Sequence, residues 1–308
     1  MSATVPKVAV IPANDEIERA VVSAGGVLAG AAAADAIVWM DPRDPEGLRA
    51  ALKGSPARWV QLPFAGIESF LASGVIDPAR TWTCAKGIYG PATAEHALAL
   101  ILASARGLHR HARTSRWLRS SEVPSRRLAG GVVLIIGTGG IGAALAAMLA
   151  PFGVTIVAAN RSGRAVEWAT ETLAAGELTK GLPGADWVVV AAPLTPETER
   201  LIDAEALGRM RPDAWLINVA RGGLVDTEAL VEALRDGRIG GAGLDVTDPE
   251  PLSESHPLWS MENVIITSHQ ANTWEMALPE LAKLVERNVR RFAAGEELEG
   301  LVDLGLNY

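Results

Sequence analysis

Three residues in the second half of the chain could carry acid–base chemistry on a small anion: Arg221, Glu250 and His269. Each follows an apolar run of strand length, and open parallel sheets bind their ligands at the carboxyl ends of such strands. Such a set could act on a small carboxylate that also carries a carbonyl or hydroxyl group, because a cation can bind the carboxylate and a proton can be exchanged with the neighbouring oxygen. Arginine offers a rigid bidentate fork for the first task. Histidine supplies a proton near neutral pH, and an adjacent carboxylate keeps it protonated.

Taken singly, these residues have ordinary explanations. A lone histidine is more often structural than catalytic, and a lone arginine or glutamate is commonly solvated or paired with an opposite charge. Their joint occurrence in one cofactor-binding domain favours catalysis.

A glycine-rich turn predicts that domain. The apolar run 132–136 leads into Gly137-Thr138-Gly139-Gly140-Ile141-Gly142, and the helix-like stretch 143–149 follows. In this strand–turn–helix setting, the first glycine permits a tight turn and the second lets the backbone approach a pyrophosphate. The third allows the helix to pack closely on the strand, and the N–H groups at the helix start receive the phosphate charge.

The end of the next strand bears on the choice between NAD and NADP. An NAD site usually has an acidic residue there for the ribose 2′-hydroxyl. This chain has Asn160, Arg161 and Ser162, followed by Gly163 and Arg164. Arginine and serine can bind a 2′-phosphate that a carboxylate would repel, so we expect NADP as the preferred cofactor, with NAD as the alternative. The alternative that these residues form an ordinary surface loop, and that the site still tolerates NAD, remains open.

The elements that must position these motifs form two series of alternating strands and helices, which predicts an α/β fold with two doubly wound parallel sheets. The first series has four predicted strands: 8–11, 36–40, 59–62 and 82–85. The second has six: 132–136, 155–159, 187–191, 215–219, 241–246 and 264–267. A long helix from Pro91, with an apolar stripe at Leu98, Ile101, Leu102, Ala105 and Leu108, crosses between the two series. A last helix from about Glu275 carries its own stripe: Leu281, Leu284, Val285, Val289 and Phe292.

Size and composition limit the class of protein. A chain of 308 residues exceeds one ordinary domain, and its net charge of −8 argues against nucleic acid or an anionic membrane as the main partner. The single cysteine, Cys84, fits a reducing compartment and a buried strand. No targeting segment and no membrane-spanning stretch is visible, so we expect a cytoplasmic protein. No His or Cys cluster predicts a metal site.

These motifs together resemble the D-isomer-specific 2-hydroxyacid dehydrogenase family over nearly the whole chain. The matching segments are 128–142, 193–198, 216–226, 243–252 and 263–269. The resemblance implies that Arg221 binds the substrate carboxylate and carbonyl oxygen, that His269 is the acid–base group, and that Glu250 supports it. It also implies that Asp245 holds the nicotinamide carboxamide, and it adds Pro193, Thr198 and Ala220 to the cofactor site.

The resemblance extends to the first series of strands. Family members bind the substrate carboxylate on backbone amides of a glycine-containing loop, and Ala65, Gly66 and Ile67 occupy that place; a simple strand-to-helix turn is the alternative. It implies a flavodoxin-like substrate domain, residues 1–95 and 276–308, into which a Rossmann cofactor domain, residues 96–275, is inserted. Relatives are typically dimers, so a homodimer is expected.

Within the family, the glyoxylate/hydroxypyruvate reductase branch is the nearest in motif. Two departures are Ser268 in place of the usual proline before the histidine, and Gln270 where an apolar residue is common. The end of the chain at Tyr308 disfavours a phosphoglycerate dehydrogenase with a regulatory extension. A formate- or phosphite-oxidising enzyme and a non-catalytic NAD(P)-sensing protein remain the alternatives.

A basic run follows the crossing helix and is interpreted as a solvated helical face and connector rather than an anion-binding patch. It comprises Arg106, Arg110, Arg113, Arg116 and Arg119, with His109 and His111 among them. Most of the nine tryptophans are expected in the core. Trp117 is the candidate exception, because some relatives place a tryptophan near here to reach the neighbouring subunit's active site.

Overall fold

The computed structural model describes residues 5–304, which form two compact units. One unit ends at Tyr89 and resumes at Thr273, and the other runs from Gly90 to Asn272. The domain boundaries expected from the sequence lie after residues 95 and 275.

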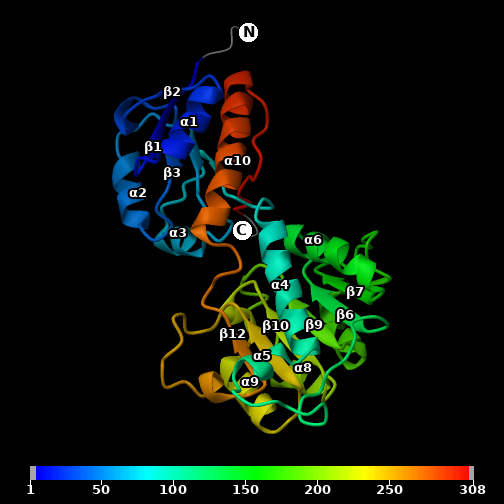
Figure 1. Ribbon diagram of the computed structural model, residues 1–308. Helices are drawn as coiled ribbons and strands as arrows, with labels where there is room; N and C mark the ends of the chain where they lie inside the picture. The colour runs from blue at the N-terminus through cyan, green and yellow to red at the C-terminus, as the bar shows by residue number, and fades with distance from the viewer. Residues whose placement is uncertain (1–4, 305–308) are drawn as a thin grey trace. The chain divides into compact units, whose positions relative to one another are not determined.

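The first unit contains a five-stranded parallel sheet in the order β2-β1-β3-β4-β5 (Figure 1). This 2-1-3-4-5 order is the flavodoxin-like arrangement. The strands are β1 (Lys7–Ile11), β2 (Val27–Leu28), β3 (Ala36–Trp39), β4 (Trp59–Gln61) and β5 (Thr81–Thr83). The sequence missed β2, because it is a two-residue edge strand with both side chains exposed and no apolar run.

Four helices cover this sheet, two on each face. They are α1 (Asp15–Ser23), α2 (Pro45–Leu52), α3 (Glu68–Ser73) and α10 (Trp274–Ala294). Successive strand side chains point to opposite faces. Val8 and Val38 accordingly pack in one core cluster with α1 and α10, whereas Ala9 and Ile37 pack in another with α2 and α3.

A buried polar network ties α10 to the sheet of this unit. The Asn288 side chain, fully buried, donates to Gln61 Oε1 at 3.1 Å and accepts from the Glu299 backbone N–H at 2.8 Å. Thr83 donates to the same Gln61 oxygen at 2.8 Å and accepts from the Trp59 indole N–H at 2.7 Å. Because these buried polar groups have partners, they hold the returning C-terminal segment in place at little desolvation cost.

The second unit contains a seven-stranded parallel sheet in the order β12-β11-β10-β9-β6-β7-β8. Its strands are β6 (Val132–Ile136), β7 (Thr155–Asn160), β8 (Glu171–Ala174), β9 (Trp187–Val190), β10 (Trp215–Asn218), β11 (Gly241–Leu244) and β12 (Val264–Ile266). Six were predicted. The seventh, β8, lies at the edge with Leu173 as its one buried side chain, so its sequence carries little strand signal.

The helices of the second unit also divide between the two sheet faces (Figure 1). They are α4 (Gly90–Ala105), α5 (Leu108–Ala112), α6 (Gly140–Leu149), α7 (Leu178–Gly181), α8 (Ala204–Arg209) and α9 (Thr227–Arg235). Val133 and Ile135 pack with α4 and α6, whereas Leu134 and Ile136 pack with α7, α8 and α9. The predicted fold class, two parallel-sheet α/β domains of Rossmann and flavodoxin type, is confirmed.

The crossing helix is shorter than predicted. It ends at Ala105, and Gly107 adopts a left-handed conformation with φ of 60° that separates α4 from α5. Leu108, predicted in the apolar stripe, is therefore 53% exposed. Trp117 and Trp259 are also exposed, at 93% and 42%, so the expectation of core packing fails for Trp259 and holds for the buried tryptophans of the strands.

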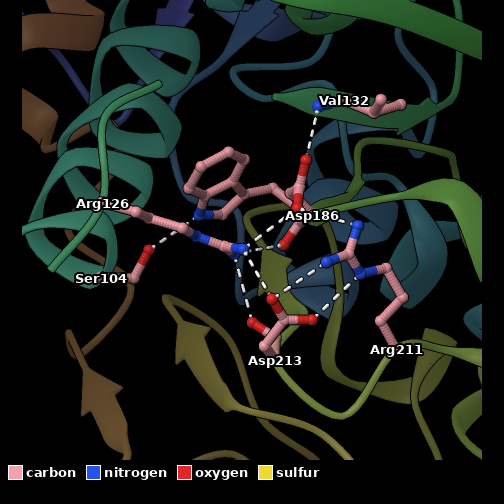
Figure 2. A network of polar contacts seen from close by, with 7 residues as sticks. Ser104, Arg126, Val132, Asp186, Arg211 and Asp213 are labelled. Carbon is pink, nitrogen blue, oxygen red and sulfur yellow. Dashed lines mark hydrogen bonds and ion pairs between the residues drawn. The ribbon is translucent and has the colours of Figure 1, made fainter. Parts of the chain in front are cut away.

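The connector after α5 is fastened to the amino-terminal edge of the second sheet by Arg126 (Figure 2). Its guanidinium lies 4.2 Å from the Trp187 ring centroid and donates to Asp186 Oδ1 at 3.0 Å. Asp186 in turn accepts from the Val132 backbone N–H at 2.7 Å. The basic run before it is only partly a solvated face, since Arg113 donates to the Met261 and Val264 carbonyls. Within residues 5–304, no helix is long and apolar enough to cross a membrane.

Candidate active site

Arg221, Glu250 and His269 follow three neighbouring strands of the second unit. Arg221 comes after β10, Glu250 after β11 and His269 after β12, and these strands are adjacent in the sheet. Because the strands are parallel, all three residues lie at the same, carboxyl-terminal edge. The glycine turn leaves this edge too, from β6.

Glu250 and His269 are in direct contact. His269 Nδ1 lies 2.7 Å from Glu250 Oε1. The loop that carries Glu250 is shaped by two hydroxyls: Thr227 donates to the Asp248 carbonyl at 2.7 Å, and Thr247 donates to the Pro249 carbonyl at 3.0 Å. With Nδ1 bound to the carboxylate, Nε2 is the ring atom that can exchange a proton with a substrate.

The His269 loop, residues Thr267–Ala271, is held by Asp245. The His269 backbone is left-handed, with φ of 55°, a conformation that costs free energy for a residue with a Cβ. Its N–H donates to the Asp245 carbonyl at 2.8 Å. The Asp245 carboxylate, 2% exposed, accepts the N–H groups of Gln270 at 2.8 Å and Ala271 at 3.0 Å. These bonds compensate the strain and fix the imidazole.

Arg221 extends from a loop braced by a buried asparagine. Asn218, 1% exposed, donates from its amide to the Arg221 carbonyl at 2.8 Å and accepts from the Ala220 N–H at 3.1 Å. The Arg221 guanidinium donates to the Ala220 carbonyl at 2.7 Å.

Gly222 brings the loops after β10 and β11 into backbone contact. A Cβ at this position would lie 1.9 Å from the Thr247 carbonyl oxygen, so only glycine fits. The loops that carry Arg221 and Glu250 therefore touch through their main chains, and their side chains have little freedom to drift apart.

The glycine turn fits a dinucleotide pyrophosphate. Gly137 has a φ of 109°, and a Cβ at Gly142 would lie 2.2 Å from the Gly137 carbonyl oxygen, so the turn and the close packing both require glycine. Gly139, the N-cap of α6, has open space around it, and no side chain of the described residues caps the helix. The N–H groups of the first turn of α6 thus lack a side-chain cap and are available to an anion.

The loop after β7 presents polar and cationic groups and no carboxylate. Asn160 organises it, accepting from the Ser162 N–H at 3.2 Å and donating to the Arg164 carbonyl at 2.8 Å. Arg161 and Ser162 are exposed. A 2′-phosphate would meet a cation and a hydroxyl here, so the residues fit NADP.

The segment after β9 forms a closed turn. Thr198 Oγ1 donates to the Pro193 carbonyl at 2.7 Å and accepts from the Thr195 N–H at 2.8 Å. These side-chain bonds fix a compact loop beside the glycine turn, because β9 is the neighbour of β6 in the sheet.

The predicted substrate loop lies in the first unit, between β4 and α3. Ala65 is exposed and Gly66 is half-buried, whereas the Ile67 side chain is 2% exposed and belongs to the core. Ile67 can therefore offer a ligand only its main chain. The Phe64 ring packs against Tyr89 and Trp274, with centroids 6.0 and 5.7 Å apart, and backs the loop.

The sequence analysis did not single out His96, a polar residue on α4 of the second unit. Its Nε2 lies 2.8 Å from Thr267 Oγ1, at the start of the His269 loop. The signal that could have revealed it is the pair Glu95-His96, which interrupts an otherwise apolar helix.

Comparison with known proteins agrees with this geometry. Residues 98–271 match the family model described as "D-isomer specific 2-hydroxyacid dehydrogenase, NAD binding domain". A glyoxylate reductase from Pyrococcus furiosus is 38% identical in an alignment of 219 residues that covers 67% of this chain and 63% of that relative.

Two solved structures share the whole fold. A D-isomer specific 2-hydroxyacid dehydrogenase from Xanthobacter autotrophicus, in complex with NADPH, is 30% identical with a TM-score of 0.83, covering 99% of this chain and 100% of its own. An NADPH-dependent glyoxylate/hydroxypyruvate reductase from Sinorhizobium meliloti, in complex with NADP, is 25% identical with a TM-score of 0.82 and the same coverage.

The chain belongs to the D-isomer specific 2-hydroxyacid dehydrogenase family. The predicted class is thereby confirmed: an oxidoreductase that uses NADP or NAD on a small 2-oxo or 2-hydroxy acid.

Proposed function

We propose that this enzyme reduces glyoxylate, hydroxypyruvate or a 2-oxo acid of similar size to the D-2-hydroxy acid, with NADPH as the preferred cofactor. The observation that carries the proposal is the 2.7 Å contact of His269 with Glu250, at the sheet edge that also presents Arg221. The names of the Pyrococcus and Sinorhizobium relatives support the substrate class.

Each side chain has one task in this proposal. The Arg221 guanidinium binds the carboxylate and carbonyl oxygen of the substrate and polarises the carbonyl. The backbone amides of Ala65, Gly66 and Ile67 bind the carboxylate as well. His269 donates the Nε2 proton to the carbonyl oxygen as it becomes an alkoxide, and Glu250 stabilises the imidazolium and its orientation. The bound nicotinamide supplies the hydride.

Cofactor binding is assigned to the carboxyl-terminal edge of the second sheet. Gly137, Gly139, Gly140, Ile141 and Gly142 would hold the pyrophosphate. Asn160, Arg161 and Ser162 would hold the adenosine ribose and its 2′-phosphate. The remaining cofactor contacts are assigned to Pro193, Thr198, Ala220 and Asp245.

His269→Ala tests the chemistry. Turnover should fall by roughly two to four orders of magnitude, because the proton donor is lost. The dissociation constant of NADPH should change little, since the glycine turn and the Asn160 loop are untouched. The measurement is steady-state reduction of a panel of 2-oxo acids together with fluorescence titration of NADPH. Near-normal turnover of the variant would refute the assignment.

Arg161→Asp tests the cofactor choice. The substitution places a carboxylate where a 2′-phosphate would bind, so kcat/KM should shift toward NADH. Arg238→Asp, an exposed arginine paired with Asp236, is the control for a change of surface charge. Equal use of NADH and NADPH by the unmodified enzyme would contradict the preference.

We also propose a cytoplasmic homodimer without nucleic-acid or membrane partners. The net charge of −8 disfavours polyanionic partners, and the 93% exposed Trp117 is a large apolar side chain that a second subunit could cover. Light scattering of the purified chain, alone and with Trp117→Ser, tests the oligomeric state.

A further inference from the structure

His96 belongs to a chain of hydrogen bonds that ends on Asp245. Thr267 Oγ1 donates to Asp245 Oδ1 at 2.6 Å, and His96 Nε2 lies 2.8 Å from the same hydroxyl oxygen. A hydroxyl has a single proton. Because Thr267 gives that proton to the carboxylate, it must accept from His96, so Nε2 carries a hydrogen. The imidazole also lies 3.3 Å from Asp245 Oδ1.

This arrangement joins two elements that the chain order keeps apart. His96 lies on α4 between the buried Ala94 and Ala97, whereas the hydrogen-bond donors described for the Asp245 side chain come from the His269 loop itself. Among the described contacts, His96 thus links this buried carboxylate, through Thr267, to a helix. A buried carboxylate depends strongly on its donors, so removing one should loosen what it holds.

We propose that His96 is a positioning residue for His269. Through Thr267 and Asp245 it fixes the loop that keeps the His269 ring against Glu250, and it touches neither substrate nor reacting atoms. The kinetic consequence rests on the proposed function, but the consequence for loop order does not. A bond that only fastened α4 to the sheet would change the melting temperature and leave the His269 loop as ordered as before.

The first experiment measures loop order without substrate. Amide hydrogen exchange of the full chain is followed in peptides covering Thr267–Ala271, with β9 as the internal reference. His96→Leu and Thr267→Val should each speed exchange in the loop by about tenfold, because one of its anchoring bonds is lost. His96→Gln and Thr267→Ser, which keep a donor and a hydroxyl in place, should exchange within about twofold of the unmodified chain. His111→Leu, on the exposed side of α5, is the matched control.

The second experiment measures the effect on turnover. His96→Leu should lower kcat for 2-oxo acid reduction about three- to tenfold, because the proton donor is less well aligned. His96→Gln should restore most of that loss. The double variant His96→Leu, Thr267→Val should be no slower than Thr267→Val alone, since that substitution already removes the acceptor of the His96 bond.

The two proposals fail separately. If loop exchange in His96→Leu equals that of the unmodified chain, His96 has no positioning role, whatever Thr267→Val or the activity shows. If the loop responds as expected but the unmodified enzyme reduces no 2-oxo acid, the proposed function is wrong and the positioning role stands. Should His96→Leu fail to fold, His96→Phe, which fills the space without offering a donor, takes its place in the exchange measurement.

Discussion

Glu250 and His269 form a contact of 2.7 Å although both side chains are about half exposed, at 44% and 50%. Water screens such a pair, so its electrostatic contribution in the free enzyme is modest. Bound cofactor and substrate would exclude water and strengthen the same contact. We therefore expect Glu250 to matter more for turnover than for stability.

Glu250→Gln should lower turnover with little effect on stability. The amide keeps the size of the side chain but lacks the charge that would stabilise His269 during proton transfer. We expect kcat for reduction of the 2-oxo acid to fall about tenfold or more, with the melting temperature little changed. Steady-state kinetics and thermal melts measure this, and unchanged turnover would rule out the supporting role.

Arg221→Lys should separate charge from geometry at the carboxylate site. An ammonium keeps the charge but cannot donate two parallel bonds to a carboxylate. We expect KM for the 2-oxo acid to rise about tenfold and kcat to fall as well, since the carbonyl contact made in the transition state is also lost. Arg238→Lys is the control at an exposed ion pair. Unchanged kinetics would show that the substrate carboxylate does not bind to Arg221.

At the scale of elements, the site depends on loops that touch through their main chains. Gly222 allows the loop after β10 to meet Thr247 in the loop after β11. The neighbouring Gly223 is less constrained, because a Cβ there would first meet the flexible Leu194 side chain at 3.2 Å. Two adjacent glycines thus have unequal structural roles.

Gly222→Ala should be far more harmful than Gly223→Ala. The first substitution must push two backbone segments apart and should cost about 1–3 kcal/mol of stability, with loss of turnover because Arg221 and Glu250 separate. The second needs only a small shift of Leu194 and should change stability little. Thermal melts and kcat of both variants provide the comparison. Equal tolerance of the two substitutions would show that the loops are not in fixed contact.

At the scale of the whole molecule, the half-buried His109 links stability to pH. His109 packs against Trp215, with ring centroids 5.1 Å apart, and its ring nitrogens lack hydrogen-bond partners within the described residues. Burial lowers the pKa of His109 below its ordinary value of 6.5. Below that pH the unfolded chain binds a proton that the folded chain resists, so stability declines as the pH falls from 6.5 through the folded-state pKa.

His109→Phe should reduce this acid sensitivity, because a phenyl ring can pack on Trp215 and takes up no proton. The free energy of unfolding from urea titrations at pH 7 and pH 5 should differ less in the variant than in the unmodified chain. His111→Phe, at an exposed position of the same helix, should leave the difference as it was. An unchanged difference in His109→Phe would assign the acid sensitivity to other groups.

Local patterns in the sequence were enough to predict most of the fold. Apolar runs of strand length between helical stretches predicted ten of the twelve strands found in residues 5–304, and the glycine turn predicted a nucleotide-binding edge. Both signals are local, because the backbone period and the need for glycine depend on a few neighbouring residues. The two missed strands, β2 and β8, lie at sheet edges, where few side chains are buried and the apolar signal is weak.

Contacts between distant segments were decided by the tertiary structure alone. Residue types pointed to Glu250 and His269, but the order of β10, β11 and β12 in the sheet brings their loops together. Spacing along the chain likewise gave no reason to join His96 to Thr267, which stands 171 residues later. Such a bond depends on the packing of α4 against the sheet. The sequence determined which side chains were present, and the sheet order and helix packing determined which of them meet.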